Sequence, residues 1–420
     1  MVGLVFVAAY SGRRPFCVGE SLADSEVMNL GTVDRDTTFV DRLSPASRLI
    51  KRCIQCGTCS ASCPTAYAMD HTPRQVWRLL QLGFVDEVLK SRAFWLCTVC
   101  QACQVRCRRG IDIKDAMVAL KEWAVHEGIE VPERLDVLRE TVVHQHNISG
   151  DDNANRLVWS ENLLDPPVGV KPRRQVAETV YFVGCVSSFY PRTYAIPRAL
   201  VQVMDRAEIE FTTLGGDEWC CGYPLYVAGM RDRMAGLAEH NLARVRDAGA
   251  ERVVFTCPSC HYAWSHLYPE FSDTSGLRLL HATELTADLV RDDQLPLGPV
   301  EEVVTYHDPC DLGRKGGVYD APREVLTAIP GLELREMAMN RQDALCCGGG
   351  GDVETVDPDV PVGVAMKRLA QVEATGAKYV ASACQQCERT LQEGARKNRI
   401  RVRAVDVVEL LWRSVQAAES

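Results

Sequence analysis

Ten of the 19 cysteines in the chain fall into one pattern that occurs twice. In each copy, a lone cysteine is followed after 34 or 35 residues by two adjacent cysteines, and these are followed after 35 or 36 residues by a C-x-x-C pair. Corresponding cysteines lie 125 to 127 positions apart, which predicts two copies of one site that face or neighbour each other. The first cysteine set comprises Cys185, Cys220, Cys221, Cys257 and Cys260, and the second cysteine set comprises Cys310, Cys346, Cys347, Cys384 and Cys387.

Eight further cysteines form two C-x2-C-x2-C-x3-C runs, the spacing that bacterial ferredoxins use for four-iron clusters. The first run ends in Pro64, whereas Arg108 takes the place of the usual proline after the second. The fourth cysteine of such a run ligates the other cluster. Zinc leaves no role for eight cysteines in two identical runs. We therefore predict that one cubane [4Fe-4S] cluster is held by Cys53, Cys56, Cys59 and Cys107, and another by Cys97, Cys100, Cys103 and Cys63.

The composition is that of an ordinary soluble globular protein. The 420 residues suggest two to four domains, and 46% are hydrophobic and 25% charged. The net charge of −9 argues against a general nucleic-acid binder. No apolar run approaches the roughly 18 residues of a membrane helix, so no direct membrane span is expected. Residues 1–10 contain an apolar run that no basic residues precede. This makes a poor signal peptide and favours a short strand or extension.

We therefore expect the protein to lie in the reducing cytoplasm, where thiols stay free to bind metals or to take part in catalysis. Any attachment to a membrane would then be through a partner. Cys17 stands alone and is predicted to be an incidental or structural thiol.

The elements that must position the paired cysteine sets alternate between strand and helix. Apolar segments directly precede most of the cysteines, and helical spacing follows in residues 230–245 and 364–372. This alternation predicts largely parallel sheets, in which ligands gather where the strands end. Five thiolates would therefore converge on one edge of each repeat. The predicted strands span residues 179–184, 208–214, 252–256, 303–307, 332–334 and 378–383.

Glycines follow both pairs of adjacent cysteines, at Gly222 and at residues 348–351. Adjacent cysteines can serve one site only if the backbone bends sharply, and glycine permits that bend. A phosphate-binding loop is the alternative for residues 348–351. It lacks both the GxGxxG spacing and a following Lys-Ser/Thr.

The first eight cysteines are predicted to lie among helices. One helix should run from Thr72-Pro73 to Gly83, and another over residues 113–123. The expected fold is α/β, with an all-helical ferredoxin-type domain before two repeated α/β domains. Arg106, Arg108 and Arg109 adjoin a predicted ligand. They are a solvated basic loop or, alternatively, raise the cluster potential or dock an acidic partner. The expected divisions are an extension at 1–45, the ferredoxin-type domain at 46–130, a turn-rich linker at 131–177, and cysteine-rich domains at 178–300 and 301–420.

Together these motifs resemble the heterodisulfide reductase family. The duplicated cysteine pattern resembles its CCG domain, as do His307-Asp308-Pro309-Cys310 and the segment Tyr319-Asp320-Ala321-Pro322-Arg323. The runs at residues 53–59 and 95–100 resemble its small ferredoxin-like component. The order matches the fused form of the family, its D-type subunit, in which the ferredoxin-type part precedes the CCG part. The likeness covers residues 46–418.

This resemblance implies that each complete cysteine set holds a non-cubane four-iron cluster. It also implies that the ten CCG cysteines are catalytic: a small disulfide lodges between the two sites and leaves as two thiols. Disulfide reduction takes two electrons, which the two cubane clusters would supply. A flavin-containing iron–sulfur subunit or a membrane cytochrome b subunit would be the partner.

Three alternatives stay open. The first is that one CCG site holds zinc in place of iron, since a pair such as Cys384 and Cys387 can bind zinc. The second is that the chain is an electron-transfer module of a larger redox or electron-bifurcating complex, of the benzoyl-CoA reductase or sulfur-metabolism type, without disulfide chemistry. The third concerns the polar residues beside the cysteines. His307, and less so His261, would donate protons in catalysis, whereas the other interpretation is that these histidines and Asp308 hydrogen-bond the cluster sulfurs or groups in the core.

Overall fold

The structure, a computed structural model, describes residues 34–171 and 177–419. The strand or extension predicted at residues 1–10, most of the extension at 1–45, and Cys17 lie outside the described residues. None of the helices in the described part of the chain combines the length and the apolar character that a membrane crossing requires.

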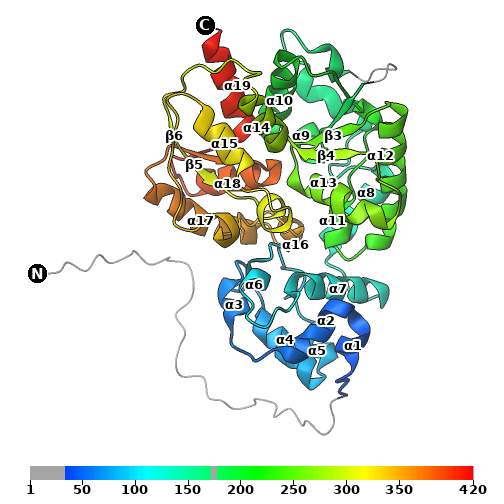
Figure 1. The fold of residues 1–420 in the computed structure, drawn as a ribbon. Coiled ribbons are helices and arrows are strands. Elements are labelled where there is room, and N and C mark those ends of the chain that lie inside the picture. The colour runs from blue at the N-terminus through cyan, green and yellow to red at the C-terminus, as the bar shows by residue number, and fades with distance from the viewer. Residues whose placement is uncertain (1–33, 172–176, 420) are drawn as a thin grey trace, which may run out of the picture.

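The N-terminal region is helical, as Figure 1 shows in blue and cyan. The predicted helix after Thr72 is confirmed as α4: Thr72 and Gln75 form a capping box at its start, and Gly83 ends it with φ +84°. The predicted helix at 113–123 is confirmed as α7. The helices of this region are α1 (Phe39–Leu43), α2 (Pro45–Arg48), α3 (Thr58–Ser62), α4 (Pro73–Leu82), α5 (Val85–Leu89), α6 (Ala102–Val105) and α7 (Ile113–His126).

The segment predicted as a turn-rich linker is more ordered than its composition indicated. It contains the 13-residue helix α8 (Glu133–Gln145), which the sequence analysis did not predict. Two 3-10 helices follow, η2 (Asn153–Ser160) and η3 (Val168–Val170). Trp159 in η2 is fully buried, whereas Leu164 is fully exposed. The segment is therefore packed into the protein through η2.

Two four-stranded parallel sheets carry the rest of the chain, with orders β2-β1-β3-β4 and β6-β5-β7-β8. The parallel α/β prediction is confirmed, and six strands lie within the predicted segments. Strands β4 and β8, each the last strand at one edge of its sheet, were not predicted. Each has four residues and begins with an exposed arginine. The strands are β1 (Thr179–Phe182), β2 (Phe211–Thr213), β3 (Arg252–Phe255), β4 (Arg278–His281), β5 (Val303–His307), β6 (Glu333–Leu334), β7 (Tyr379–Ser382) and β8 (Arg403–Asp406).

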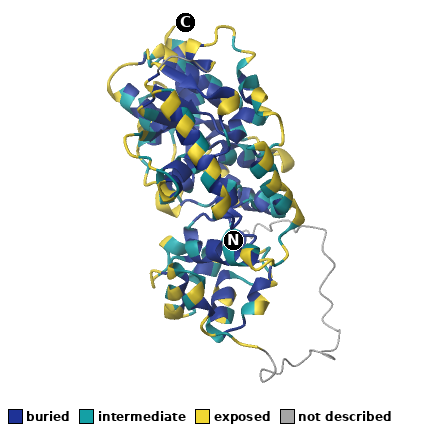
Figure 2. Cartoon of the chain, turned by 90° about the vertical axis from the view of Figure 1, so that its right-hand side faces the viewer, coloured by how far each residue is buried: buried dark blue, intermediate teal, exposed yellow. Residues whose placement is uncertain are grey.

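Helices cover both sheets and join them. Helix α10 packs on α19, and α14 on α15, so that the two α/β units share one buried core that includes Tyr181 and Tyr306 (Figures 1 and 2). A second core joins the first unit to the helical region. The remaining helices are α9 (Cys185–Phe189), α10 (Ala195–Arg206), α11 (Tyr223–Val227), α12 (Ala235–Asp247), α13 (Pro258–Tyr262), α14 (Ala282–Arg291), α15 (Ala321–Ala328), α16 (Val353–Val356), α17 (Asp359–Ala374), α18 (Gln385–Lys397) and α19 (Val407–Ala418).

Candidate metal centres

The ferredoxin-type cysteines gather into two groups. The outer group lines one small cavity, together with Ile54, Trp77 and Arg109. The loop that carries three of its thiols turns through two left-handed residues, Gln55 (φ +59°) and Gly57 (φ +82°). The structure thus brings together the four residues that the sequence assigned to one cluster: Cys53, Cys56, Cys59 and Cys107.

The inner group repeats this loop. Its left-handed residues are Val99 (φ +56°) and Gln101 (φ +61°), and a β-branched residue in that conformation is strained. Burial, to which the nearby Cys97 and Cys100 add, raises the pKa of the Cys63 thiol to about 12. The inner group consists of Cys63, Cys97, Cys100 and Cys103. Burial, and then the neighbouring thiols of the other three members, raise the pKa of the Cys103 thiol, which indicates that the four lie close together.

The second cysteine set lies at the carboxyl ends of β5 and β7 and after the loop that follows β6. The thiol of Cys347 donates to Sγ of Cys387 at 3.3 Å, and the backbone N–H of Cys387 donates to Sγ of Cys384 at 3.3 Å. Ligand atoms of His307, Cys347 and Cys387 lie within 4.8 Å of one another. Cys310 directly precedes the π-helical turn η9 (Asp311–Lys315) and is partly exposed. A His-Cys-Cys group is also one that zinc accepts, so the zinc alternative concerns this site.

The glycines after the adjacent cysteines bend the chain as expected. Gly222 has φ +80° and Gly348 has φ +100°. The N–H of Gly348 donates to Sγ of Cys346 at 3.3 Å, and that of Gly349 donates to Sγ of Cys347 at 3.4 Å. Backbone N–H groups that a phosphate would need are thus directed at thiols.

The rest of the glycine run fits against the helical region. A Cβ on Gly350 would lie 2.7 Å from the carbonyl oxygen of Thr98, and one on Gly351 would lie 2.2 Å from that of Cys97. Only glycine permits such an approach of two backbones. The thiol of Cys346 reaches Oγ1 of Thr98 at 3.8 Å.

The second set and the inner group therefore adjoin. A hydrogen bond from Cys346 lowers the pKa of the Cys100 thiol to about 5. Arg314 joins the same two loops, since its Nε donates to the carbonyl of Cys100 and its Nη1 to that of Ala344, both at 2.7 Å.

The first cysteine set is buried throughout and lines a cavity between the two α/β units. Hydrogen bonds from Cys220 and Cys260 lower the pKa of the Cys221 thiol to about 6. Tyr223 and Ser259 complete the wall on the side of the first unit. The opposite wall comes from the second unit and consists of Gly349, Gly350, Gly351, Asp352 and Gln386.

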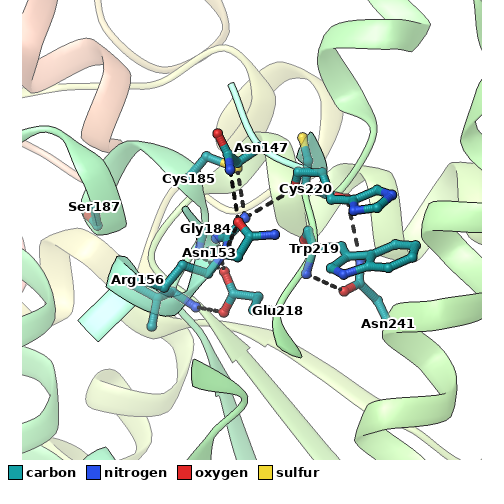
Figure 3. A network of polar contacts seen from close by, with 12 residues as sticks. Asn147, Asn153, Arg156, Gly184, Cys185, Ser187, Glu218, Trp219, Cys220 and Asn241 are labelled. Atoms are coloured by element: carbon teal, nitrogen blue, oxygen red, sulfur yellow. Dashed lines mark hydrogen bonds and ion pairs between the residues drawn. The ribbon is translucent and has the colours of Figure 1, made fainter. Parts of the chain in front are cut away.

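A buried ion pair supports the first set (Figure 3). Nη1 of Arg156 lies 2.9 Å from Oε1 of Glu218, and its Nη2 donates to Sγ of Cys185 at 3.4 Å. Both side chains are 1% exposed. Glu218 also accepts the N–H groups of Val183 at 2.8 Å and Gly184 at 2.9 Å, just before Cys185. This pair could not be predicted from the sequence, because a lone arginine in a turn-rich segment carries no local pattern.

The turn-rich segment itself forms part of this site. Asn147 is fully buried and its amide donates to the carbonyl of Asp151 at 2.8 Å and to Oδ1 of Asn153 at 2.9 Å. The carbonyl of His146 accepts the N–H of Cys220 at 2.7 Å. The expected linker thus fixes a backbone group of a predicted ligand.

The polar residues next to the second set are engaged within the protein. Nδ1 of His307 accepts Nε–H of buried Arg368 at 3.0 Å, and the same imidazole bonds Cys347. Asp308 holds both terminal nitrogens of Arg323, at 2.7 and 3.0 Å. His261 instead adjoins Cys260 of the first set, and burial lowers its pKa to about 4.

The basic loop of the helical region is split between two environments. Arg106 pairs with Asp343 of the second unit at 3.2 Å, and Arg109 donates to the carbonyl of Arg52 at 3.2 Å. Arg108 is exposed near Cys56.

The donor chemistry fits iron–sulfur clusters. The 18 cysteines among the described residues are free thiols, clustered in four groups and mostly buried. Soft thiolates with backbone N–H donors directed at them are what such clusters require.

Matches to known families agree with this donor set. Residues 49–111 match the 4Fe-4S dicluster domain, and residues 179–264 and 304–392 match the cysteine-rich CCG domain. A helical dicluster region followed by two parallel α/β CCG units defines an iron–sulfur oxidoreductase subunit.

Known relatives narrow this class. The chain is 31% identical over 386 residues to the D subunit of the dihydromethanophenazine:CoB–CoM heterodisulfide reductase of Methanosarcina mazei, covering 86% of this chain and 92% of that protein. It is 27% identical to the B subunit of the fumarate reductase (CoM/CoB) of Methanothermobacter marburgensis, covering 95% of this chain and 80% of that one. It is also 27% identical to the EtfAB:quinone oxidoreductase of Syntrophomonas wolfei, covering 80% and 48%. The chain belongs to the family of heterodisulfide reductase D subunits.

Proposed function

We propose that this chain is the disulfide-reducing subunit of a heterodisulfide-reductase-type complex. The observation that carries the proposal is the cavity that all five cysteines of the first set share with the glycine run of the second unit. Cubane clusters would be held by the outer and inner groups, and non-cubane four-iron clusters by the first and second cysteine sets. When bound, these clusters supply electrons singly, whereas cleavage of a disulfide takes two.

A groove supplies the route for a small disulfide. The cavity shares Ile148, Pro224, Gly349, Asp352 and Gln386 with a groove that continues to Tyr190 and Arg389. Beyond it lies a surface hollow that adds Arg192, Glu393 and Lys397. The substrate would enter along this groove and place its sulfurs between the two sets.

The spatial order of the four cysteine groups supports a path for electron transfer between the protein surface and the cavity. Cys56 of the outer group is exposed. The inner group meets the second set through Cys100 and Cys346. The two sets approach each other between the units, where Gln385, next to Cys384, donates to Oγ1 of Thr256, next to Cys257, at 2.6 Å.

The exposed edge of the outer group is the proposed docking surface for the electron-exchanging partner. Ile54 is 61% exposed there, and Arg52, Arg108 and Arg109 are exposed around it. This basic rim stands out in a protein of net charge −9. The partner, a flavin-containing iron–sulfur subunit or a membrane cytochrome b subunit, would present an acidic surface.

The second candidate is an electron-transfer module without disulfide chemistry. The relatives named as EtfAB:quinone oxidoreductase and as a subunit of fumarate reductase (CoM/CoB) favour it, because similar sequences occur in proteins with other named activities.

The deciding experiment is anaerobic purification followed by metal analysis and turnover. Four four-iron clusters require about 16 irons per chain. Reduced methyl viologen should be oxidised when bis(2-hydroxyethyl) disulfide is added, with two thiols formed per disulfide. About eight irons together with zinc would contradict the non-cubane pair. Full iron with no turnover of any small disulfide would favour the electron-transfer module.

A further inference from the structure

Asp352 occupies a distinctive place between the cavity and the groove. It follows the glycine run directly, precedes α16, and lines both spaces. Its backbone is left-handed, with φ +55°. Its Oδ2 is buried and has no hydrogen-bond partner. Among the residues that line the cavity, it supplies the sole carboxyl group.

A fixed cation lies behind this carboxyl group. Lys121 of α7 is 1% exposed, and its Nζ donates to the carbonyls of Val227 at 2.8 Å and Gly351 at 3.4 Å. Lys121 attracts the Asp352 carboxylate without being its hydrogen-bond partner. Burial outweighs this attraction and raises the pKa of Asp352 to about 7.

Apart from the thiols of the first set, which are the proposed cluster ligands, the other charged and titratable groups that line the cavity and the groove are already engaged. Arg389 of α18 pairs with Glu354 of α16 and stacks over Tyr190 at 4.7 Å. The hydroxyl of Tyr223 of α11 accepts from Lys315 at 2.6 Å. Asp352 therefore lines the cavity and the groove and keeps one buried carboxyl oxygen without a hydrogen-bond partner.

We propose that Asp352 is the proton donor to the substrate sulfur in the cavity, an inference that rests on the proposed disulfide reduction. Cleavage of the S–S bond would consume two electrons, which the clusters would supply when bound, and each sulfur would gain one proton. One proton comes from Asp352 and the other from water in the groove. Water then returns a proton to Asp352, whose position on both spaces makes this exchange direct. His307, by contrast, does not line the cavity and is committed to Arg368 and Cys347.

The test uses Asp352→Asn in the full chain with its clusters. Asparagine tolerates a left-handed backbone, so the loop conformation should persist. With methyl viologen and bis(2-hydroxyethyl) disulfide, turnover should fall about 100-fold or more, the usual contribution of a general acid. The wild-type rate should decline as pH rises through about 7, and the variant should lack this decline. Asp359→Asn, which alters a 92% exposed carboxylate of α17, should keep both the rate and the pH profile.

A second readout is independent of turnover. The pH-difference infrared spectrum of the wild type should contain a protonated carboxyl band that titrates near pH 7 and is missing from Asp352→Asn. Absence of that band in the wild type would overturn the inference. So would an Asp352→Asn variant with full iron, an unchanged rate and an unchanged profile, and the proposed function would then survive. A wild type that reduces no disulfide although viologen reduces its clusters would overturn both.

Discussion

The two cysteine sets share one strand-end plan but have different surroundings. The first set is buried throughout, faces the cavity, and is supported by Arg156 from the preceding segment. The second set leaves Cys310 partly exposed and adjoins the inner ferredoxin-type group through Cys346. We infer from this difference that duplication was followed by a division of roles, with the second set nearer the electron supply and the first nearer the substrate.

Residues at equivalent positions show how the surroundings diverged. His307, which bonds Cys347, corresponds to apolar Phe182 in the first unit, 125 positions earlier. Glu218, which holds the chain before Cys185, corresponds to Ala344, 126 positions later. Different polar residues therefore support the two cysteine sets. The residues that support one set could not be predicted from the equivalent positions of the other repeat.

The largest expected effect comes from removing one proposed ligand of each set. Cys346→Ser should abolish disulfide turnover and slow reduction of the first set, because the proposed electron path runs from the inner group through the second set. Cys220→Ser should also abolish turnover, but the second set should still be reduced. Electron paramagnetic resonance of the reduced proteins distinguishes the two cases. Equal spectra from both variants would refute the proposed order, and unchanged cubane signals provide the internal control.

The next effect tests the support that belongs to the first set alone. Arg156→Gln leaves Glu218 buried and unpaired, which should lower the free energy of unfolding by about 3–5 kcal/mol. Urea titration of the anaerobic protein measures the change. Arg206→Gln, which removes the partner of Glu419 in a pair that is 47% and 44% exposed, should cost about 1 kcal/mol or less. Adding Glu218→Gln to Arg156→Gln should recover part of the loss; a loss as small as in the control would show that the ion pair is dispensable.

The features that the sequence predicted depend on contacts between neighbouring residues, whereas the features that it missed depend largely on contacts between distant segments. The positions of six strands and the bend at Gly348 depend on local sequence, so they were predicted correctly. Arg156 and Asp352 acquire their environments only when distant segments pack, as with Lys121 behind Asp352. Strands β4 and β8 were missed because each is short and begins at an exposed arginine. Helix α8 was missed because it buries only Leu135 and Val142, which leaves a weak apolar stripe.

A third effect tests the junction that belongs to the second set alone. Gly351→Ala would force a Cβ to within 2.2 Å of the carbonyl of Cys97, in addition to straining a left-handed backbone. Overpacking and strain together should cost about 2–4 kcal/mol and slow electron transfer into the second set. The matched control is Gly276→Ala, where φ is +83° but no atom lies within 4 Å of the added carbon, so only about 1 kcal/mol of strain is expected. Equal losses would mean that the close approach to Cys97 is not required.

The smallest effect concerns the surface farthest from the paired sets along the proposed electron path. Arg108→Glu reverses one charge beside exposed Cys56 and should slow association with an acidic partner about tenfold at low salt. The difference should shrink as salt rises, because screening weakens interactions between exposed charges. Reduction by viologen should remain unchanged, since a small donor needs no docking surface. Arg401→Glu reverses an exposed charge of the second α/β unit and serves as the control. A similar slowing by Arg401→Glu would mean that net charge, rather than the basic rim at the outer group, governs the encounter.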